Sequence, residues 1–311
     1  MDVVSVENLV KRYGSMVALD HLSLAVREGE VFGLLGPNGS GKTTAINCIL
    51  QLLTYDKGSI RLFGEPMTPT RYDLKRRIGV VPQNVAVFEE LTVRQNVDYF
   101  CGLYVPDRAR RRQLVNDALE FVGLQDFERM VPKKLSGGLQ RRLNIACGVA
   151  HRPDLAFFDE PTVAVDPQSR ASILEGIKGM NRSGMTVVYT SHYMEEVEDI
   201  CSRIMIMDHG RTLAIGTNEE LKAQVKVGER IRIALGEAPD EMLRDLRALA
   251  VVRSAEREGD ALVVVCENGS HNVADVLGVL RHHRLTPGRI WAEPPTLNDV
   301  FLEITGRELR D

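Results

Sequence analysis

The feature that most constrains how this chain can fold is a glycine-rich octapeptide near its N-terminus. Residues 36–43 read GPNGSGKT and fit the pattern G-x-x-x-x-G-K-[ST] without a gap. A continuous apolar run, residues 31–35, precedes the octapeptide, and apolar residues at helical spacing follow it as far as Leu53. This context predicts a loop between a buried strand and a helix, in which backbone N–H groups converge on a phosphate.

The pattern also predicts roles for single residues of this loop. Lys42 is expected to reach the β- and γ-phosphates of a nucleotide, and Thr43 is expected to offer its hydroxyl to Mg²⁺. We therefore expect a nucleoside triphosphate with Mg²⁺ at this loop. The residues expected to bind the nucleotide here are Gly36, Pro37, Asn38, Gly39, Ser40, Gly41, Lys42, Thr43 and Thr44.

A second buried run, residues 155–158 (LAFF), ends in two carboxylates, Asp159 and Glu160. A phosphate loop of this kind is paired with a carboxylate that ends a neighbouring strand and holds Mg²⁺, and Asp159 fits that role. Glu160 stands one residue further on, where it is expected to orient or deprotonate the attacking water. The two motifs together predict nucleotide hydrolysis.

The chain of 311 residues has room for two domains. Continuous apolar runs at residues 31–35, 78–81, 155–158 and 185–190 alternate with helical patterns, which predicts a largely parallel α/β core. Helical periodicity alone fills residues 90–150, so we expect an inserted helical subdomain there. Beyond residue 229 the order β-α-β-β-α-β predicts a ferredoxin-like α+β domain that ends in a helix. The predicted domains are residues 1–222 and 229–311.

Composition excludes several other classes of protein. The net charge of −4 gives no basic surplus, so no nucleic-acid partner is expected. The N-terminus lacks the pattern of a secretory signal, and no apolar run is long enough to span a bilayer, so we expect a cytoplasmic chain unless a partner holds it at a membrane. Five scattered cysteines favour buried thiols over disulfides or zinc ligands.

Residues 135–140 (LSGGLQ) narrow the range of nucleotide hydrolases. Ser136 can cap a helix that begins at Gly137, which leaves a glycine-rich helix start open to phosphate. Together with the phosphate loop, this segment resembles the signature sequence of the ATP-binding subunits of ABC transporters, and the resemblance covers about residues 3–220. It implies ATP as the nucleotide, a mostly parallel sheet with an antiparallel β edge, and two copies paired head to tail. The residues implied to bind the partner's ATP are Leu135, Ser136, Gly137, Gly138 and Gln140.

Four further residues match this family in chain order. Tyr13 resembles the aromatic residue that stacks on adenine, and Gln83 resembles the glutamine that touches Mg²⁺ and senses the helical subdomain. Asp166 resembles the aspartate that crosses the dimer interface, and His192 resembles the histidine that contacts the γ-phosphate. The resemblance therefore implies Lys42, Glu160 and His192 as catalytic residues and Thr43, Gln83 and Asp159 as metal ligands.

One residue departs from the family's pattern. Ala164 stands where relatives usually have glycine. If the backbone needs a positive φ at this position, alanine strains the turn, and we expect slower dimer closure.

Three segments indicate which kind of transporter the chain serves. Residues 141–146, 166–170 and 295–307 resemble the ATPases of multidrug and daunorubicin-resistance exporters of the ABC-2 type. This resemblance implies export of a drug-like or lipid-like substrate through a separate integral membrane permease, with the ATPase on the cytoplasmic face of the inner or plasma membrane.

Other functions remain open at this point. An importer ATPase of the methionine type also carries a ferredoxin-like, regulatory C-terminal domain. A permease-independent ABC ATPase acts on nucleic acid or the ribosome, but such chains carry coiled-coil inserts or two fused ATPase domains. A non-hydrolysing subunit is opposed by Glu160 and His192. The C-terminal domain carries no motif, and both a packing or dimerisation role and a ligand-binding role fit it.

Overall fold

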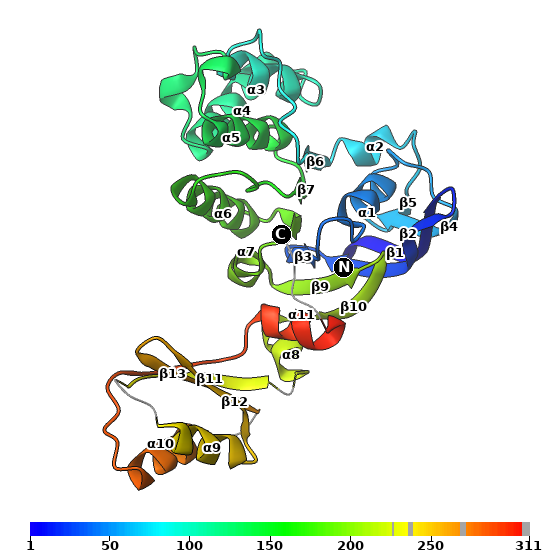
Figure 1. Ribbon diagram of the computed structural model, residues 1–311. Helices are drawn as coiled ribbons and strands as arrows, with labels where there is room; N and C mark the ends of the chain where they lie inside the picture. Colours follow the sequence, from blue (N-terminus) through cyan, green and yellow to red (C-terminus); the bar gives the residue numbers. More distant parts are fainter. Residues whose placement is uncertain (226, 236–238, 268–271, 307–311) are drawn as a thin grey trace. The chain divides into compact units, whose positions relative to one another are not determined.

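The structure is a computed structural model that describes residues 1–225, 227–235, 239–267 and 272–306 (Figure 1). These residues fall into two compact units, the first ending at Thr217 and the second beginning at Asn218. Helix α8 (Asn218–Ala223) packs against α11 (Leu297–Thr305) and so groups with the second unit. The domain boundary at residues 222–229 stays a prediction, and residues 307–311 of the predicted second domain lie outside the described residues.

The first unit is built on a six-stranded sheet. Every neighbouring pair of strands in it is parallel except β10 and β9 at one edge. The four apolar runs expected as strands are therefore confirmed, and the carboxyl ends of β3, β7 and β8 meet at one edge of the sheet. Across the sheet the strands are β10 (Arg211–Gly216), β9 (Arg203–Asp208), β3 (Val31–Leu35), β8 (Thr186–Ser191), β7 (Leu155–Asp159) and β6 (Ile78–Val81).

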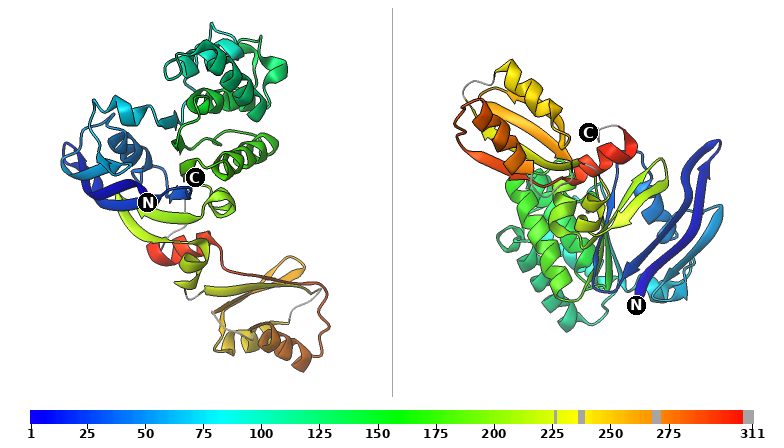
Figure 2. Two further views of the ribbon diagram at one scale, coloured as in Figure 1. Left: turned by 180° about the vertical axis from the view of Figure 1, so that it is seen from behind. Right: turned by 90° about the horizontal axis from the view of Figure 1, so that it is seen from below.

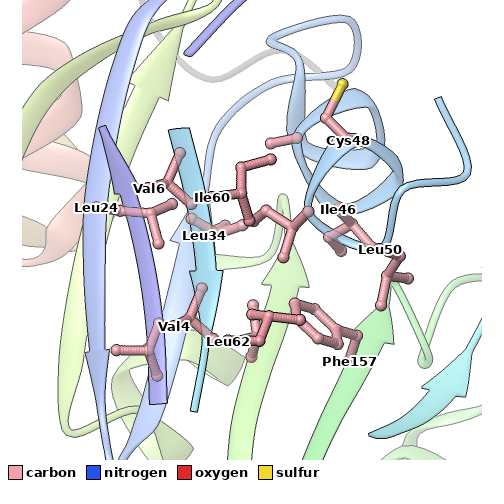
Figure 3. Packing of buried hydrophobic residues seen from close by; sticks show 14 of the residues in the cluster. Val4, Val6, Leu24, Leu34, Ile46, Cys48, Leu50, Ile60, Leu62 and Phe157 are labelled. Carbon is pink, nitrogen blue, oxygen red and sulfur yellow. The ribbon is translucent and has the colours of Figure 1, made fainter. Parts of the chain in front are cut away.

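A second, antiparallel sheet of four strands faces the first across a shared core. Its order is β2 (Met16–Arg27), β1 (Asp2–Tyr13), β4 (Lys57–Leu62) and β5 (Glu65–Pro66). Figure 3 shows the core between the sheets and helix α1 (Lys42–Ile49), where Val4, Leu24, Ile60, Leu34 and Phe157 meet. The antiparallel part is thus mostly a separate sheet, and β10 alone is an antiparallel edge strand of the six-stranded sheet.

Helix α1 is shorter than the apolar spacing predicts. It ends at Ile49, and Gln51 has a positive φ of 56° that turns the chain out of the helix. Leu53 lies beyond the helix but still packs, partly buried, against the same core. The periodic pattern therefore identified core residues correctly and placed the helix end too late.

The predicted helical subdomain is confirmed between β6 and β7. It contains α3 (Val93–Gly102), α4 (Arg108–Phe121) and α5 (Gly137–Val149), which contact one another (Figures 1 and 2). Each helix starts at a side-chain cap, namely Thr92, Asp107 and Ser136, which accepts a backbone N–H of the first turn. Two short 3₁₀ turns, residues 125–127 and 132–134, connect α4 to α5, and a short helix α2 (Tyr72–Lys75) precedes β6.

Two helices complete the first unit. Helix α6 (Pro167–Arg182) follows β7 through the turn at residues 160–166, and α7 (Met194–Ile200) follows β8. Among the described residues, no helix is both long enough and apolar enough to cross a membrane.

The second unit has the predicted order β-α-β-β-α-β. Its elements are β11 (Val227–Ala234), α9 (Asp240–Ala248), β12 (Val252–Glu258), β13 (Ala261–Glu267), α10 (Asn272–His282) and β14 (Ile290–Glu293). The strands form one antiparallel sheet in the order β12-β13-β11-β14. Its core joins apolar side chains of the strands, such as Ile231 and Val264, to those of α9 and α10, such as Leu246 and Val276.

Candidate active site

The loop that joins β3 to α1 has a backbone that only glycine accommodates at two points. Gly41 has a φ of 106° and stands directly before α1, and a Cβ there would lie 2.8 Å from the carbonyl oxygen of Ala18. A Cβ on Gly36 would collide with the carbonyl oxygen of Met207. Because no side chain caps α1, the N–H groups of its first turn are available to an anion.

Lys42 is the first residue of α1, and its side chain is buried, with 4% exposed. Its Nζ donates to the carbonyl oxygens of Gly36, at 2.7 Å, and Pro37, at 3.1 Å. The same nitrogen lies 3.1 Å from Oε1 of Glu160, which is equally buried. The loop thus presents a fixed positive charge beside the proposed catalytic carboxylate.

Asp159 is held from both sides at the end of β7. Thr43 Oγ1 donates to Asp159 Oδ2 at 2.8 Å, and Thr190 Oγ1 donates to Asp159 Oδ1 at 2.7 Å. A hydroxyl and a carboxylate side by side are hard oxygen ligands of the kind that Mg²⁺ prefers. The described residues contain no group of three or more His, Cys, Asp or Glu side chains fit for a metal.

Glu160 occupies a left-handed backbone position, with a φ of 46°. Its N–H donates to Thr190 Oγ1 at 2.9 Å, so the turn out of β7 is tied to β8. Its Oε2 accepts from Gln83 Nε2 at 3.0 Å and lies 3.4 Å from Nδ1 of His192. The structure therefore brings together Lys42, Gln83, Glu160 and His192, which lie far apart in the sequence.

Three of these residues, Lys42, Gln83 and Glu160, border a pocket of about 410 Å³, whereas His192 does not line it but contacts Glu160. The pocket extends from the loop and Glu160 to Tyr13 at the end of β1, whose ring is 44% exposed and has the amine of Lys11 5.0 Å from its centroid. Met16, Val17 and His209 also line it, and no motif indicated them. The pocket thus joins an exposed aromatic ring at one end to a cationic, glycine-lined end.

The remaining predicted residues form a second group at the starts of α5 and α6. Ser136 caps α5 and Asp166 caps α6, each accepting a backbone N–H three residues on, at 3.3 and 2.9 Å. The backbone N–H and the hydroxyl of Ser169 hold the pKa of Asp166 below its ordinary value. A Cβ on Gly138 would lie 2.7 Å from Ser169 Oγ, so the two helix starts are in close contact.

The side chain of Gln140 fixes the 3₁₀ turn before α5 by donating to the carbonyl oxygens of Pro132, at 3.0 Å, and Leu135, at 3.3 Å. Ser136 and Gly137 are exposed. None of the residues that line the pocket comes from segment 135–140, and Asp166 does not line it either. Within one chain, the structure therefore separates the predicted site residues into two groups.

Ala164 has a φ of +58°, in the left-handed region that favours glycine. An alanine in this region costs about 1–2 kcal/mol. Ala164 therefore strains the turn, as expected for an alanine at a position with positive φ.

Sequence reasoning missed a polar connection between α5 and the site. The guanidinium of Arg141 is buried and donates to the carbonyl oxygens of Gln83 and of Val163, the latter at 3.5 Å. Burial lowers the pKa of Arg141. Asn144, one turn later, donates to Pro82 O at 3.1 Å and accepts the N–H of Ala86 at 3.0 Å. Polar residues three apart in an otherwise apolar helix face were the available signal.

Comparison with known proteins identifies the family. The sequence profile described as ABC transporter matches residues 19–163. The chain is 36% identical, over 99% of its length, to the whole of the linearmycin resistance ATP-binding protein LnrL of Bacillus subtilis. It is 35% identical, again over 99% of its length, to 95% of the Nod factor export ATP-binding protein I of Ralstonia nicotianae and to 97% of the daunorubicin resistance ATP-binding protein DrrA3 of Streptomyces coeruleorubidus.

Solved structures agree with the sequence relatives. The structure of cbiO1 from Clostridium perfringens, part of the ABC transporter complex cbiONQ, matches with a TM-score of 0.66 at 26% identity, over 72% of this chain and 91% of that one. The dimeric, post-hydrolysis structure of the ATP-binding cassette MJ0796 with ADP and Pi matches with a TM-score of 0.63 at 28% identity, over 69% and 98%. The chain therefore belongs to the ABC transporter family, as an ATP-binding subunit that hydrolyses ATP.

Proposed function

We propose that the chain powers the export of a drug-like or lipid-like molecule through a separate ABC-2 type permease, at the cytoplasmic face of the membrane. The names of its relatives support this direction, because they describe resistance to linearmycin and daunorubicin and the export of Nod factor. The observation that carries the mechanism is the separation of the site into two groups, one around the pocket and one at the starts of α5 and α6.

Two copies complete the site in this proposal. Each copy binds ATP at its own pocket, and residues 135–140 with Asp166 of the other copy close over it. Ser136 and Gly137 support this arrangement, because they are exposed at a capped helix start and do not line the pocket beside Lys42. A head-to-tail pair with twofold symmetry contains two such sites.

The chemistry at each site is in-line attack of water on the γ-phosphate. Glu160 orients the water and takes its proton, the oxygen–phosphorus bond to ADP breaks, and the proton passes to the released phosphate. Lys42 stabilises the negative charge on the β- and γ-phosphates, and His192 contacts the γ-phosphate. Thr43 and Asp159, with Gln83 nearby, would hold Mg²⁺, which offsets charge on the same phosphates.

An exposed aromatic group marks the surface expected to contact the permease. Phe88 and Tyr99 are exposed and pack edge to face, with ring centroids 4.9 Å apart, and Phe100 stacks on Phe88 at 5.8 Å. The buried side chain of Asn96 fixes the loop by accepting the N–H of Phe88 and donating to its carbonyl oxygen. This loop runs on from Gln83, so a movement of the site reaches the aromatic surface directly.

Mixing two inactive variants tests the composite site. Lys42→Ala inactivates the pocket, and Ser136→Arg blocks the start of α5. In a head-to-tail pair, a mixed dimer keeps one intact site, so an equal mixture should recover about a quarter of the wild-type ATPase rate if the sites act independently. Each variant alone should be inactive. A mixture as inactive as its components would exclude the proposal that residues 135–140 act on the partner's ATP.

Glu160→Gln tests the catalytic role. The amide keeps the shape of the side chain but does not take the proton, so turnover should stop while ATP still binds. We expect an ATP-dependent dimer in size-exclusion chromatography with light scattering. Hydrolysis at the wild-type rate would refute the role of Glu160.

The gene beside this one tests the export proposal. A neighbouring gene for a six-helix membrane protein, whose product copurifies with this chain, is the expected result. A neighbouring gene for a substrate-binding protein would instead favour the importer alternative. Phe88→Asp should weaken copurification of the permease and leave the ATPase rate of the isolated chain within twofold of the wild type.

A further inference from the structure

Behind the active site lies a second group of buried polar side chains that the mechanism above does not use. Its centre is Glu196 of α7, whose side chain is 3% exposed. Oε2 of Glu196 accepts hydrogen bonds from Tyr189 OH at 2.7 Å, Thr162 Oγ1 at 2.8 Å and Ser191 Oγ at 3.0 Å. Its Oε1 lies 3.3 Å from Nε of Arg170. We call these five residues the Glu196 cluster.

Two of the donors belong to the segments that carry proposed site residues. Thr162 lies in the turn at residues 160–166, between Glu160 and Asp166. Ser191 ends β8 and stands directly before His192. The turn and the segment of His192 are therefore bound to the same carboxylate oxygen.

A second connection runs through Arg170. This residue lies one turn into α6, whose cap is Asp166, and its guanidinium lies 4.6 Å from the ring centroid of Tyr193. The ring of Tyr193 in turn lies 4.1 Å from that of His192. The N–H of Tyr193 donates to Ser191 Oγ at 2.9 Å, which completes the link back to the carboxylate.

The third donor, Tyr189, comes from within β8 and carries no site residue with it. Burial and the charge of Glu196 raise the pKa of Tyr189 well above its ordinary value, so the phenol keeps its proton and donates. Its hydroxyl also lies 3.4 Å from Thr162 Oγ1, a longer contact than its 2.7 Å bond to Glu196. Tyr189 therefore serves as a comparison within the same cluster.

We propose that Glu196 is a positioning residue for ATP hydrolysis, which holds the turn of Asp166 and the segment of His192 at a fixed separation. One carboxylate oxygen that accepts from both segments allows neither to move without the other, and a buried carboxylate is costly to leave without its donors. Closure of the partner on Asp166 is thereby transmitted to His192. The inference rests on the proposed roles of Asp166 and His192.

Three hydroxyl deletions in the full-length chain test this inference, with kcat, ATP affinity and Tm measured for each. Thr162→Val and Ser191→Ala remove one link each and should lower kcat about five- to tenfold, because displaced catalytic groups lose much of their effect. ATP affinity should stay within twofold, because Lys42 and the phosphate loop are untouched. Tyr189→Phe should lower Tm about as much as Thr162→Val and Ser191→Ala do, but it should keep kcat within twofold of the wild type.

The double variant Thr162→Val with Ser191→Ala should lose less kcat than the product of the single losses, because both links act through one carboxylate. The inference would be overturned if the loss of kcat parallels the loss of Tm in all three single variants. It would also be overturned if the loss of kcat in the double variant equals the product of the single losses. His192→Ala separates the two proposals. If it keeps the wild-type kcat, the proposed site is wrong. If it loses kcat while Thr162→Val and Ser191→Ala do not, the positioning role alone fails.

Discussion

The two groups of site residues differ in how many polar contacts they make within one chain. Around the pocket, the polar groups already contact one another, because Glu160 lies 3.1 Å from Lys42 Nζ and accepts from Gln83 at 3.0 Å, and Asp159 accepts two hydroxyls. At the starts of α5 and α6, Ser136 and Asp166 are exposed and their contacts are local, since Ser136 accepts the N–H of Leu139 and Asp166 accepts the N–H and the hydroxyl of Ser169. The pocket is thus preorganised within the chain, whereas the second group is exposed and makes only local contacts, which fits the proposal that it acts on another copy.

The largest effect is expected from a substitution that disrupts the preorganised group around the pocket. Lys42→Ala removes the buried cation from between the loop carbonyls and Glu160, and turnover should fall on the order of a thousandfold, or about 4 kcal/mol. Nucleotide affinity should fall with it, as measured by titration with a fluorescent ATP analogue. Lys11→Ala, which alters the cation beside Tyr13, is the matched control and should cost far less. Unchanged affinity in Lys42→Ala would contradict the phosphate-loop assignment.

Low pH should lower the stability of the folded chain through a histidine beyond the C-terminal end of α5 rather than through the pocket. His151 follows this helix, stacks on Tyr104 at 3.9 Å and lies with Nε2 3.2 Å from the carbonyl oxygen of Ile78. Burial lowers the pKa of His151 from 6.5 to about 4, against the opposing effect of the Ile78 hydrogen bond. Because the folded-state pKa is depressed, the unfolded chain takes up a proton first, and stability falls as the pH drops from about 6.5 to about 4, by about 3 kcal/mol.

Urea unfolding at pH 7 and pH 4.5 measures this loss. His151→Phe keeps an aromatic ring against Tyr104 but does not titrate, so it should lose less stability over the same pH interval. An identical pH dependence in both proteins would show that other groups cause the loss.

A smaller effect is expected where the two helix starts meet. Gly138→Ala places a Cβ 2.7 Å from Ser169 Oγ and 3.2 Å from Asp166 Oδ2, so both side chains must shift. Turnover should fall about tenfold, or about 1.4 kcal/mol, with ATP affinity of the single chain unchanged. Gly137→Ala is the matched control for stability, because its Cβ meets nothing within 4 Å, and its Tm should equal that of the wild type. An equal loss of Tm in both variants would remove the steric explanation.

The smallest expected effect is a gain. Ala164→Gly removes the strain of a left-handed alanine, about 1 kcal/mol, although glycine adds entropy to the unfolded chain. We expect turnover to rise about twofold and Tm to rise slightly. Ala171→Gly, an exposed site inside α6, should lower Tm instead, since glycine disfavours a helix by about 1 kcal/mol. A lower rate in Ala164→Gly would show that the alanine does not slow closure.

Sequence periodicity and motif spacing predicted the central features of the first unit. Runs such as residues 31–35 and 155–158 read directly as strands because a parallel strand is buried on both faces. The pairing of the phosphate loop with Asp159 was predictable, since both motifs stand at carboxyl ends of strands in one sheet, but the contact of Lys42 with Glu160 was not predicted. The separate antiparallel sheet was not predictable, because pairing between distant strands leaves no local pattern. The early end of α1 was missed because Leu53, beyond the helix, still packs against the same core.

The residues that connect the site were harder to predict than the residues within it. Thr190 ties Asp159 to Glu160, and Glu196 gathers three hydroxyls, yet each is a common residue with no fixed spacing to its partners. Their partners come from other strands and helices, so only the folded structure shows them. Tertiary packing, and not local propensity, decides such contacts.

Arg141 has a consequence for how the helical segment moves. Its buried guanidinium donates to carbonyl oxygens of Pro82 and Gln83 in the loop before α3 and to that of Val163. A partial displacement of α5 would strip a buried cation of its oxygen ligands, which costs several kcal/mol. We therefore expect the helical subdomain to adopt two discrete positions without stable intermediates. ATP binding would then act on the permease in an all-or-none manner rather than in proportion to the movement.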